Sequence, residues 1–272
     1  MAELQEKYED LIRILKGLGS VAVAFSGGVD STFLLKAASD ALGERAAAVT
    51  VRSVSFPQRE EREAREFCEE HGIRQIVTEV DQMAIPGFAQ NPPDRCYICK
   101  SALFRKIRET AADNGLQCVV EGSNTDDAGD YRPGMRALAE QKILSPLREA
   151  LLSKTEIRQL SRQMGLPTWD KPSFACLATR FVYGETISPA KLRMVEMAEQ
   201  CLMDLGFHQF RCRVHGDLAR IELPEEALPE AVEAGIRKKI TQTLRSLGFA
   251  YVALDLDGYR QGSMNETLSE NR

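Results

Sequence analysis

The stretch VAVAFSGGVDSTFLLKAASDAL, residues 21–42, constrains the fold of this chain most strongly. Its first five residues are an apolar run of strand length, and the apolar positions from Phe33 to Ala38 fit a helix packed on a sheet. Between them lies SGGVDS, residues 26–31, whose glycines let the backbone approach an anion closely. The helix start adds unpaired N–H groups and the positive end of the helix dipole. The stretch therefore predicts an α/β fold with a phosphate-binding loop.

Asp30 is the unusual member of this loop, because a carboxylate would repel a polyphosphate unless it held a magnesium ion or capped the helix. The plain alternative is an ordinary glycine turn with a serine and aspartate cap. The loop is not a Walker A motif, which needs Gly-x-x-x-x-Gly-Lys-Ser/Thr.

Composition restricts the class of protein further. With 272 residues and a net charge of −5, the chain is long enough for one large domain or two moderate ones, and it carries no broad positive field for nucleic acid. The charged N-terminus lacks the apolar core of a signal peptide, and no apolar run reaches the length of a membrane span. We expect a cytoplasmic protein, in whose reducing surroundings the seven cysteines are ligands or catalysts more often than disulfides.

Strands alternate with helices through the first part of the chain, which favours a doubly wound parallel sheet. Buried strands are expected at residues 46–51, 76–80 and 116–121. Ligands gather at the carboxyl ends of such strands. Ser53 follows one strand, and GSNTDD, residues 122–127, follows another with carboxylates suited to magnesium. A polar helix cap is the alternative for Asp126.

A second, smaller α+β domain is expected after a boundary near residue 183, which gives domains at 1–183 and 184–260. Its pattern is a helix at 188–205, two strands around the turn His215-Gly216-Asp217, one helix at 225–247 and a last strand at 250–256. The tail at 261–272 is expected to be disordered.

Three cysteines stand out from the other four. Cys96 and Cys99 are three apart on one face of the first turn of an expected helix, and Cys176 lies in an irregular stretch. Three thiolates without a fourth ligand suit an iron–sulfur cluster with one open iron. Buried thiols without function, a structural zinc site with four ligands and a redox or persulfide-carrying pair are the alternatives. The remaining cysteines fit small core positions: Cys68, Cys118, Cys201 and Cys212.

Arg211 and Arg213 lie on the same face of an expected strand, where two guanidinium groups make a phosphate clamp. The alternative is a solvent-facing strand edge. Glu222, in the next strand, is placed to pair with one of the two arginines.

Five segments, SGGVDS, DRCYICK, EGSNTDD, KPSFACLATR and FRCRVHGDLARIEL, occur in this order. Together they resemble the LarE family of pyridinium-3,5-biscarboxylic acid mononucleotide sulfurtransferases, within the PP-loop ATP pyrophosphatases, over about residues 5–258. The resemblance implies an enzyme that adenylates each substrate carboxylate with ATP and Mg2+, releases pyrophosphate and replaces an oxygen with sulfur. The product serves the nickel-pincer nucleotide cofactor of lactate racemase. The resemblance also implies a homo-oligomer acting on a small mononucleotide, with no nucleic acid or membrane partner.

The resemblance assigns roles to particular positions. It implies catalytic roles for Cys176, Asp30 and Glu222, and substrate contacts by Tyr97, Arg180, Arg211 and Arg213. The positions implied to bind ATP are Ala24, Ser26, Gly27, Gly28, Val29, Asp30, Ser31, Ser53, Gly122, Asn124, Asp127 and Arg148. Some family members surrender the sulfur of a cysteine matching Cys176. Others add a pair matching Cys96 and Cys99 and hold a 4Fe-4S cluster, and the presence of all three cysteines here favours the cluster.

Three other functions share parts of this pattern. A PP-loop tRNA thiolase also combines the loop with Cys-x-x-Cys and a cluster, but the net charge of −5 argues against an RNA substrate. An ammonia-dependent ligase of the NAD- or GMP-synthetase type would need no cysteines at these positions. A nucleotide sensor would bind ATP without releasing pyrophosphate.

Overall fold

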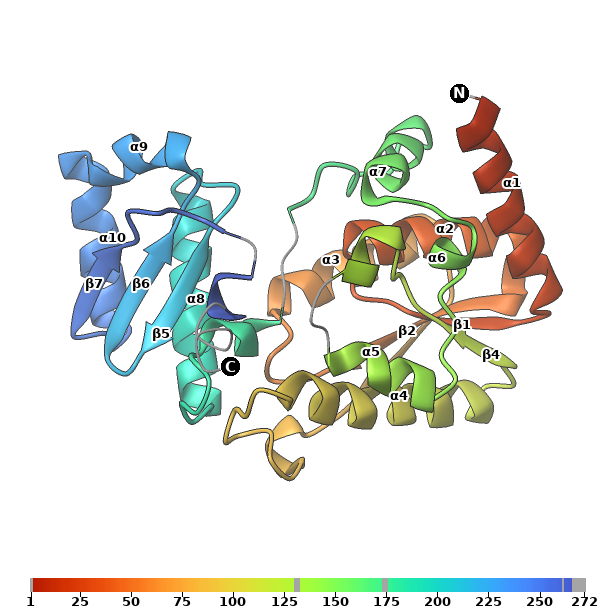
Figure 1. Cartoon of the computed structure of the whole chain (residues 1–272), viewed down its shortest axis with the longest axis horizontal. Coiled ribbons are helices and arrows are strands. Elements are labelled where there is room, and N and C mark those ends of the chain that lie inside the picture. Colours follow the sequence, from red (N-terminus) through yellow and green to blue (C-terminus); the bar gives the residue numbers. More distant parts are fainter. Residues whose placement is uncertain (1, 130–132, 173–175, 261, 266–272) are drawn as a thin grey trace. The chain divides into compact units, whose positions relative to one another are not determined.

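The strand that precedes SGGVDS is β1 (Val21–Ala24), and in the computed structural model it lies inside a parallel four-stranded sheet of order β3-β2-β1-β4 (Figure 1). Its neighbours are β2 (Ala46–Arg52) and β4 (Cys118–Val120), and β3 (Gln75–Glu79) lies beyond β2. The chain adds β2 and β3 on one side of β1 and β4 on the other. The order therefore reverses at β1, and ligands bind at such a reversal in open α/β sheets.

The structure describes residues 2–129, 133–172, 176–260 and 262–265. The chain divides into two compact units, residues 1–82 with 96–174 and residues 83–95 with 175–272. No helix among the described residues is both long and apolar enough to cross a membrane.

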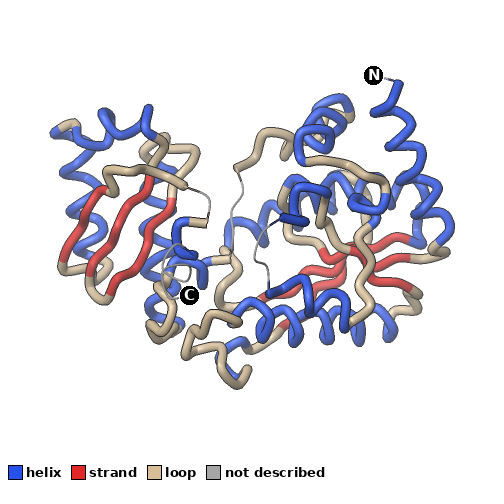
Figure 2. Tube along the Cα trace, in the orientation of Figure 1, coloured by secondary structure: helices blue, strands red, loops and turns tan. Residues whose placement is uncertain are grey.

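Helices cover both faces of the first unit's sheet, as a doubly wound fold requires (Figure 2). They are α1 (Ala2–Gly17), α2 (Val29–Leu42), α3 (Gln58–Glu70), α4 (Arg95–Asp113, with Arg95 itself in the second unit), α5 (Pro133–Glu140), α6 (Pro146–Glu149) and α7 (Lys154–Gln163). The predicted fold class is confirmed.

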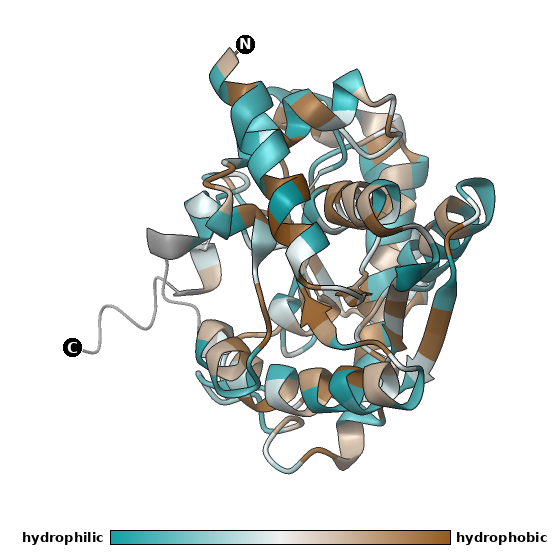
Figure 3. Cartoon of the chain, turned by 90° about the vertical axis from the view of Figure 1, so that its right-hand side faces the viewer, coloured by the Kyte–Doolittle hydropathy of each residue, from teal (hydrophilic) through white to brown (hydrophobic). Residues whose placement is uncertain are grey.

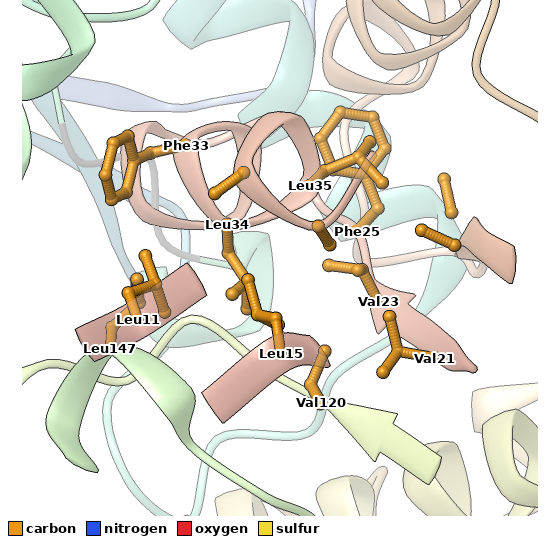
Figure 4. Close-up of a cluster of buried hydrophobic side chains, with 14 of the residues drawn as sticks. Leu11, Leu15, Val21, Val23, Phe25, Phe33, Leu34, Leu35, Val120 and Leu147 are labelled. Carbon is orange, nitrogen blue, oxygen red and sulfur yellow. The ribbon is translucent and has the colours of Figure 1, made fainter. Parts of the chain in front are cut away.

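Alternation along β1 explains the two faces. Val21 and Val23 belong to a core with α1 and α2, which includes Leu15 and Leu34 (Figure 4). Ala22, between them, belongs to a second core with residues of α4. Since successive strand residues point to opposite faces, an all-apolar β1 is buried on both sides. In Figure 3, α1, next to the label N, carries both hydrophilic and hydrophobic residues, as a helix with one buried side does.

The second unit contains a three-stranded sheet of order β5-β6-β7. Its strands are β5 (Arg211–His215), β6 (Leu218–Glu222) and β7 (Tyr251–Leu254), and its helices are α8 (Pro189–Asp204), α9 (Leu228–Val232) and α10 (Ala234–Ser246). The β5–β6 pair is antiparallel, as the predicted turn requires, and β7 joins β6 in parallel. The single helix expected at 225–247 is wrong, because Glu233 is extended, with ψ 138°, and separates α9 from α10.

The division between the units differs from the expected boundary near residue 183. Residues 83–95 belong to the second unit, where the buried Asn91 donates from Nδ2 to the carbonyl of Val182 at 2.7 Å. Arg95 donates to the carbonyl of Ala178 at 2.9 Å. Buried polar groups need such partners, so this segment is held against residues 178–182 although it is distant in sequence.

The predicted disordered tail is wrong for residues 262–265, which contain a turn of 3-10 helix. Ser263 is buried, and its hydroxyl donates to Glu222 Oε1 at 3.1 Å. Residues 261 and 266–272 lie outside the described residues.

Candidate functional site

The PP loop, residues 26–31, connects β1 to α2 at the sheet's order reversal. Gly27 has φ +71°, a left-handed conformation that favours glycine. Ser31 donates from Oγ to the carbonyl of Gly28 at 3.2 Å, and its hydroxyl is 3.1 Å from that of Ser26. Ala24 ends β1, Val29 begins α2, and Ser26 is exposed. The loop thus leaves the first N–H groups of a 14-residue helix available to an anion.

The acidic loop, residues 122–127, follows β4 and meets the PP loop. A Cβ on Gly122 would lie 3.0 Å from the backbone nitrogen of Ser31 and 3.1 Å from Cβ of Asp30. Such distances leave little room for a side chain, so glycine permits the approach. The buried Asn124 donates from Nδ2 to Asp30 Oδ1 at 3.3 Å. The structure therefore brings Asp30, Gly122 and Asn124 together, as the sequence predicts.

The two aspartates of the acidic loop differ in what they bind. Asp127 accepts from the backbone N–H of Asn124 at 3.0 Å, within its own loop. Asp126 accepts from the backbone N–H of Lys154 at 2.9 Å, at the start of α7. Asp126 thus satisfies one of the donors that the start of α7 leaves unpaired, although Ser153 is the capping residue of that helix, so its role as a helix cap stays an alternative.

Two lysines that sequence reasoning did not single out also lie at the PP loop. Lys154 places Nζ 2.5 Å from Asp30 Oδ2. Lys171 is mostly buried and donates from Nζ to the carbonyl of Gly27 at 3.0 Å and to Glu60 at 2.8 Å. The sequence did contain one indication for Lys154: a cation in the first turn of a helix is unfavourable to the helix dipole, so its presence there needs another reason. Lys171, in an irregular stretch, gave no such signal.

Ser53 and Arg148 are less closely tied to the loop. Ser53 follows β2 directly and is partly exposed, and Arg148 is exposed in α6. In the described part of the chain, no hydrogen bond or ion pair joins either side chain to the PP loop. Their assignment to ATP stays a prediction.

The candidate sulfur residues are divided between the units. Cys96 and Cys99 are the second and fifth residues of α4, and the buried Cys99 accepts a hydrogen bond from Nε2 of Gln82 at 3.1 Å. Cys176 is exposed and belongs to the second unit. Among the described residues, no three His, Cys, Asp or Glu side chains are grouped to hold a metal ion. Each unit taken by itself thus fits only part of the cluster's ligand set.

Tyr97, between the two cysteines of α4, is held by neighbouring residues. Its hydroxyl donates to Glu140 Oε2 at 2.7 Å, and the Arg136 guanidinium lies 3.5 Å from the ring centroid. Such a cation–π contact and a hydrogen bond fix the ring in one orientation. Its substrate role stays a prediction.

Two of the predicted substrate arginines of the second unit, Arg180 and Arg213, form buried ion pairs. Arg180 donates from Nε and Nη2 to the two carboxylate oxygens of Glu199, at 2.8 and 2.9 Å. Arg213 donates to Glu222 Oε2 from Nε at 3.0 Å and Nη2 at 2.9 Å. The expectation that Glu222 pairs with one arginine is confirmed.

The alternative of a solvent-facing strand edge is wrong, because Arg211 and Arg213 are only 4% and 5% exposed. Burial, and then the charge of Arg180, lower the pKa of Arg211 to about 10. The Arg211 guanidinium also lies 5.1 Å from the centroid of the Tyr259 ring. An added anion beside Arg211 would stabilise its charged form, so the phosphate-binding role stays a prediction with an electrostatic basis.

The pKa of Glu199, the carboxylate partner of Arg180, is also shifted. Burial alone would raise the pKa of Glu199, but the charge and hydrogen bonds of Arg180 outweigh it, and the pKa lies below its ordinary value. Glu199 Oε1 also accepts from the N–H of Cys212 at 3.0 Å. Glu199 was not predicted as part of this group, because its position in a helix pattern carries no signal of a partner in β5.

Comparison with known proteins finds relatives of this chain. The model of the NAD synthase family matches residues 6–109, which contain the PP loop. The pyridinium-3,5-bisthiocarboxylic acid mononucleotide synthase of Lactiplantibacillus plantarum is 39% identical over 99% of this chain and 98% of its own. An uncharacterized protein of Synechocystis sp. is 42% identical over 98% of this chain and 100% of its own. One subunit of the glutamine-hydrolysing GMP synthase of Pyrococcus furiosus is 30% identical over 72% of this chain and 66% of its own.

The NAD synthase match covers only the part of the chain around the PP loop, and the GMP synthase match covers 72% of the chain. The match to the bisthiocarboxylic acid mononucleotide synthase runs over both units, from the PP loop to β5, the strand that carries Arg211 and Arg213. The chain therefore belongs to the LarE family of PP-loop enzymes, the pyridinium-3,5-bisthiocarboxylic acid mononucleotide synthases.

Proposed function

We propose that this protein is an ATP-dependent sulfurtransferase that converts the carboxylates of pyridinium-3,5-biscarboxylic acid mononucleotide to thiocarboxylates. The observation that carries the proposal is the meeting of the PP loop and the acidic loop around Asp30, in a chain that matches a curated synthase of this kind along nearly its whole length.

The chemistry follows from the weakness of a carboxylate as an electrophile. An oxygen of the substrate carboxylate attacks the α-phosphorus of ATP, the bond to the bridging oxygen breaks, and pyrophosphate leaves. A sulfur nucleophile then attacks the acyl carbon of the adenylate, and AMP leaves with the oxygen. N–H groups at the start of α2 stabilise the charge of the polyphosphate. Asp30 is the carboxylate of the loop that would hold Mg2+, which commonly takes one or two carboxylates together with substrate phosphates.

We propose that Cys176, together with Cys96 and Cys99, delivers the sulfur. We propose that these thiolates are the protein ligands of a 4Fe-4S cluster with one open iron. The rival proposal is that Cys176 alone gives up its sulfur, once per chain. We also propose that the enzyme works in the cytoplasm as a homo-oligomer and makes the precursor of a nickel-pincer nucleotide.

Pyrophosphate release tests the first part. Anaerobically purified protein, ATP, Mg2+ and the biscarboxylic acid mononucleotide should yield pyrophosphate and a product whose mass shows oxygen replaced by sulfur. Asp30→Asn should lower the rate at least about tenfold, on the order of 1.4 kcal/mol, whereas Asp40→Asn, a change to another aspartate of the same helix, should not. Pyrophosphate release with ammonia and no sulfur in the product would favour an ammonia-dependent ligase instead.

Colour and mass test the sulfur source. The cluster proposal expects a brown anaerobic protein, and loss of both colour and activity in each of Cys96→Ala, Cys99→Ala and Cys176→Ala. If the wild type instead loses the mass of hydrogen sulfide during turnover while the Cys96 and Cys99 variants stay active, Cys176 is a sacrificial donor.

A further inference from the structure

The backbone of Cys176 is held by several donors. A turn of 3-10 helix at Leu177–Arg180 follows it directly, and we call residues 176–180 the cysteine turn. The carbonyl of Cys176 accepts hydrogen bonds from the N–H of Thr179 at 3.0 Å, from Thr179 Oγ1 at 2.7 Å and from Arg180 Nη1 at 3.3 Å. Two of these donors are side chains. The backbone of the exposed Cys176 is therefore fixed by more than the turn itself.

Arg213 of β5 holds the residue that binds the Cys176 carbonyl. Its Nη1 donates to the carbonyl of Thr179 at 3.0 Å. Phe181, just after the cysteine turn, forms a parallel β-bridge with Val214, the next residue of β5. The cysteine turn therefore lies along β5, and the Arg213 guanidinium joins the strand to the turn.

Hydrogen bonds to the protein use most of the donors of Arg213. Nε and Nη2 both donate to Glu222 Oε2, Nη1 donates to Thr179, and Nη2 also donates to Ser263 Oγ at 3.1 Å. A guanidinium has five N–H donors, so at most one of them remains for a ligand. A bidentate grip on a phosphate needs two donors. Arg213 is therefore better placed to hold protein groups than to clamp the substrate phosphate.

Ser263, beyond the last strand of the second unit, completes this group. Its buried hydroxyl accepts from Arg213 and donates to Glu222 Oε1 at 3.1 Å. The same carboxylate oxygen accepts from Arg220 Nη2 at 2.9 Å. Glu222 is fully buried, so its carboxylate needs these donors from the protein. The cysteine turn is thus connected through Arg213 to the C-terminal part of the chain.

Stability alone gives little reason for these buried charges beside the cysteine turn. A buried ion pair often stabilises no more than well-packed apolar side chains of similar volume, because both charges lose their hydration. Charged hydrogen bonds do add a fixed geometry. A reacting group needs such precision, since a displacement of about 1 Å can lower a rate about a hundredfold.

We propose that Cys176 is positioned by three side chains of the second unit. Thr179 fixes its carbonyl, Arg213 holds Thr179, and Ser263 keeps Arg213 in place. The side chain of Cys176 is then presented from one fixed place, whether the cysteine binds a cluster or gives up its own sulfur. This role rests on the proposed function, in which Cys176 is a sulfur residue.

The second unit offers a matched control for each change. Thr179→Val removes the hydroxyl and keeps a branched side chain, and Thr179→Ser keeps the hydroxyl. Thr241→Val is the control, because the hydroxyl of Thr241 on α10 also donates to a backbone carbonyl, at 3.0 Å. Ser246→Ala is the control for Ser263→Ala, since the exposed Ser246 donates to the carbonyl of Thr243 at 2.7 Å.

A single turnover of the anaerobically purified full chain separates positioning from binding. With ATP, Mg2+ and the biscarboxylic acid mononucleotide, Thr179→Val and Ser263→Ala should transfer sulfur at least about tenfold more slowly than the wild type. Pyrophosphate release should stay within about threefold, as should the calorimetric affinities for the mononucleotide and for the α,β-methylene analogue of ATP. Thr179→Ser and both controls should match the wild type.

Hydrogen exchange adds a readout that needs no substrate. The N–H of residue 179 donates to the Cys176 carbonyl, so it should exchange faster in Thr179→Val and Ser263→Ala and at the wild-type rate in both controls.

Wild-type exchange together with wild-type sulfur transfer in Thr179→Val and Ser263→Ala would overturn the proposal. Weaker mononucleotide binding with unchanged sulfur transfer from the bound substrate would also overturn it, because that result places Arg213 in a phosphate clamp. So would equal losses in Thr179→Ser and Thr179→Val, which exclude the hydroxyl as the cause. The proposed function fails separately, when the wild type forms no sulfur-containing product, and the exchange rates then decide whether these residues hold Cys176.

Discussion

The ion pair between Arg180 and Glu199 gives the sharpest test of how the second unit is built. Arg180 is 1% exposed and Glu199 is 6% exposed, and the guanidinium binds both carboxylate oxygens. The change Glu199→Gln keeps the shape of the side chain but removes its charge. Arg180 would then keep a buried positive charge without its carboxylate, which costs about 3–5 kcal/mol. This is a large part of the ~5–15 kcal/mol by which a protein is typically stable.

The effect should depend on pH in a defined direction. The pKa of Glu199 is lowered in the folded protein, so its carboxylate contributes stability above its unfolded pKa, and this contribution is lost as the pH falls through the folded one. The difference between wild type and Glu199→Gln should therefore be fully present at neutral pH. It should shrink as the pH falls below the ordinary range of a glutamic acid.

Urea unfolding followed by circular dichroism measures the loss, and hydrogen exchange localises it. The N–H of Cys212 donates to Glu199 Oε1, so its peptide should lose protection in the variant. Lys191→Met is the control, because it removes a more exposed pair with Glu185 and should cost less than about 1 kcal/mol. A loss below about 1 kcal/mol in Glu199→Gln, with unchanged exchange at Cys212, would refute the reasoning.

Two further predictions concern ligand binding. Gly122→Ala should weaken binding of the α,β-methylene analogue of ATP at least about tenfold, because its Cβ would press on Ser31 and Asp30. Gly235→Ala is the control and should leave this affinity unchanged, because its Cβ would meet nothing within 4 Å. Equal affinities in calorimetry would show that the two loops have room to separate. Arg211→Ala should weaken binding of the biscarboxylic acid mononucleotide and spare the ATP analogue, because the buried guanidinium gains from an added anion. Unchanged mononucleotide affinity in the same calorimeter would remove Arg211 from the substrate site.

The first unit's sheet and its loops could be predicted because their signals are local. The apolar run of β1, the glycines after it and the helix period of α2 lie within 22 consecutive residues. The expectation that ligand groups follow the carboxyl ends of strands then brought Gly122 and Asn124 to Asp30 without knowledge of the strand order. The close approach of Gly122 to Ser31 shows that the loops after β1 and β4 meet, as this expectation requires.

The lysines at the PP loop could not be predicted in this way. Lys154 and Lys171 meet Asp30 and Gly27 across 124 and 144 residues of sequence, and no spacing rule connects such positions. The break at Glu233 was missed for a different reason. The residues around it continue a helix pattern, and a single extended residue leaves no mark on the pattern.

The charged pairs of the two units differ in a way that bears on their use. The pair of Lys154 and Asp30 is partly exposed, so exchanging one partner for a phosphate or a metal ion costs little. The buried pair of Arg213 and Glu222 has side chains that are 6% and 0% exposed, and separating it would cost about 3–5 kcal/mol. A ligand can therefore replace one partner of the Lys154–Asp30 pair. Arg213, by contrast, can bind a substrate only while it keeps its ion pair with Glu222. We therefore expect charged groups that change partners during the reaction to lie at the PP loop, and charged groups that keep their partners to lie on β5.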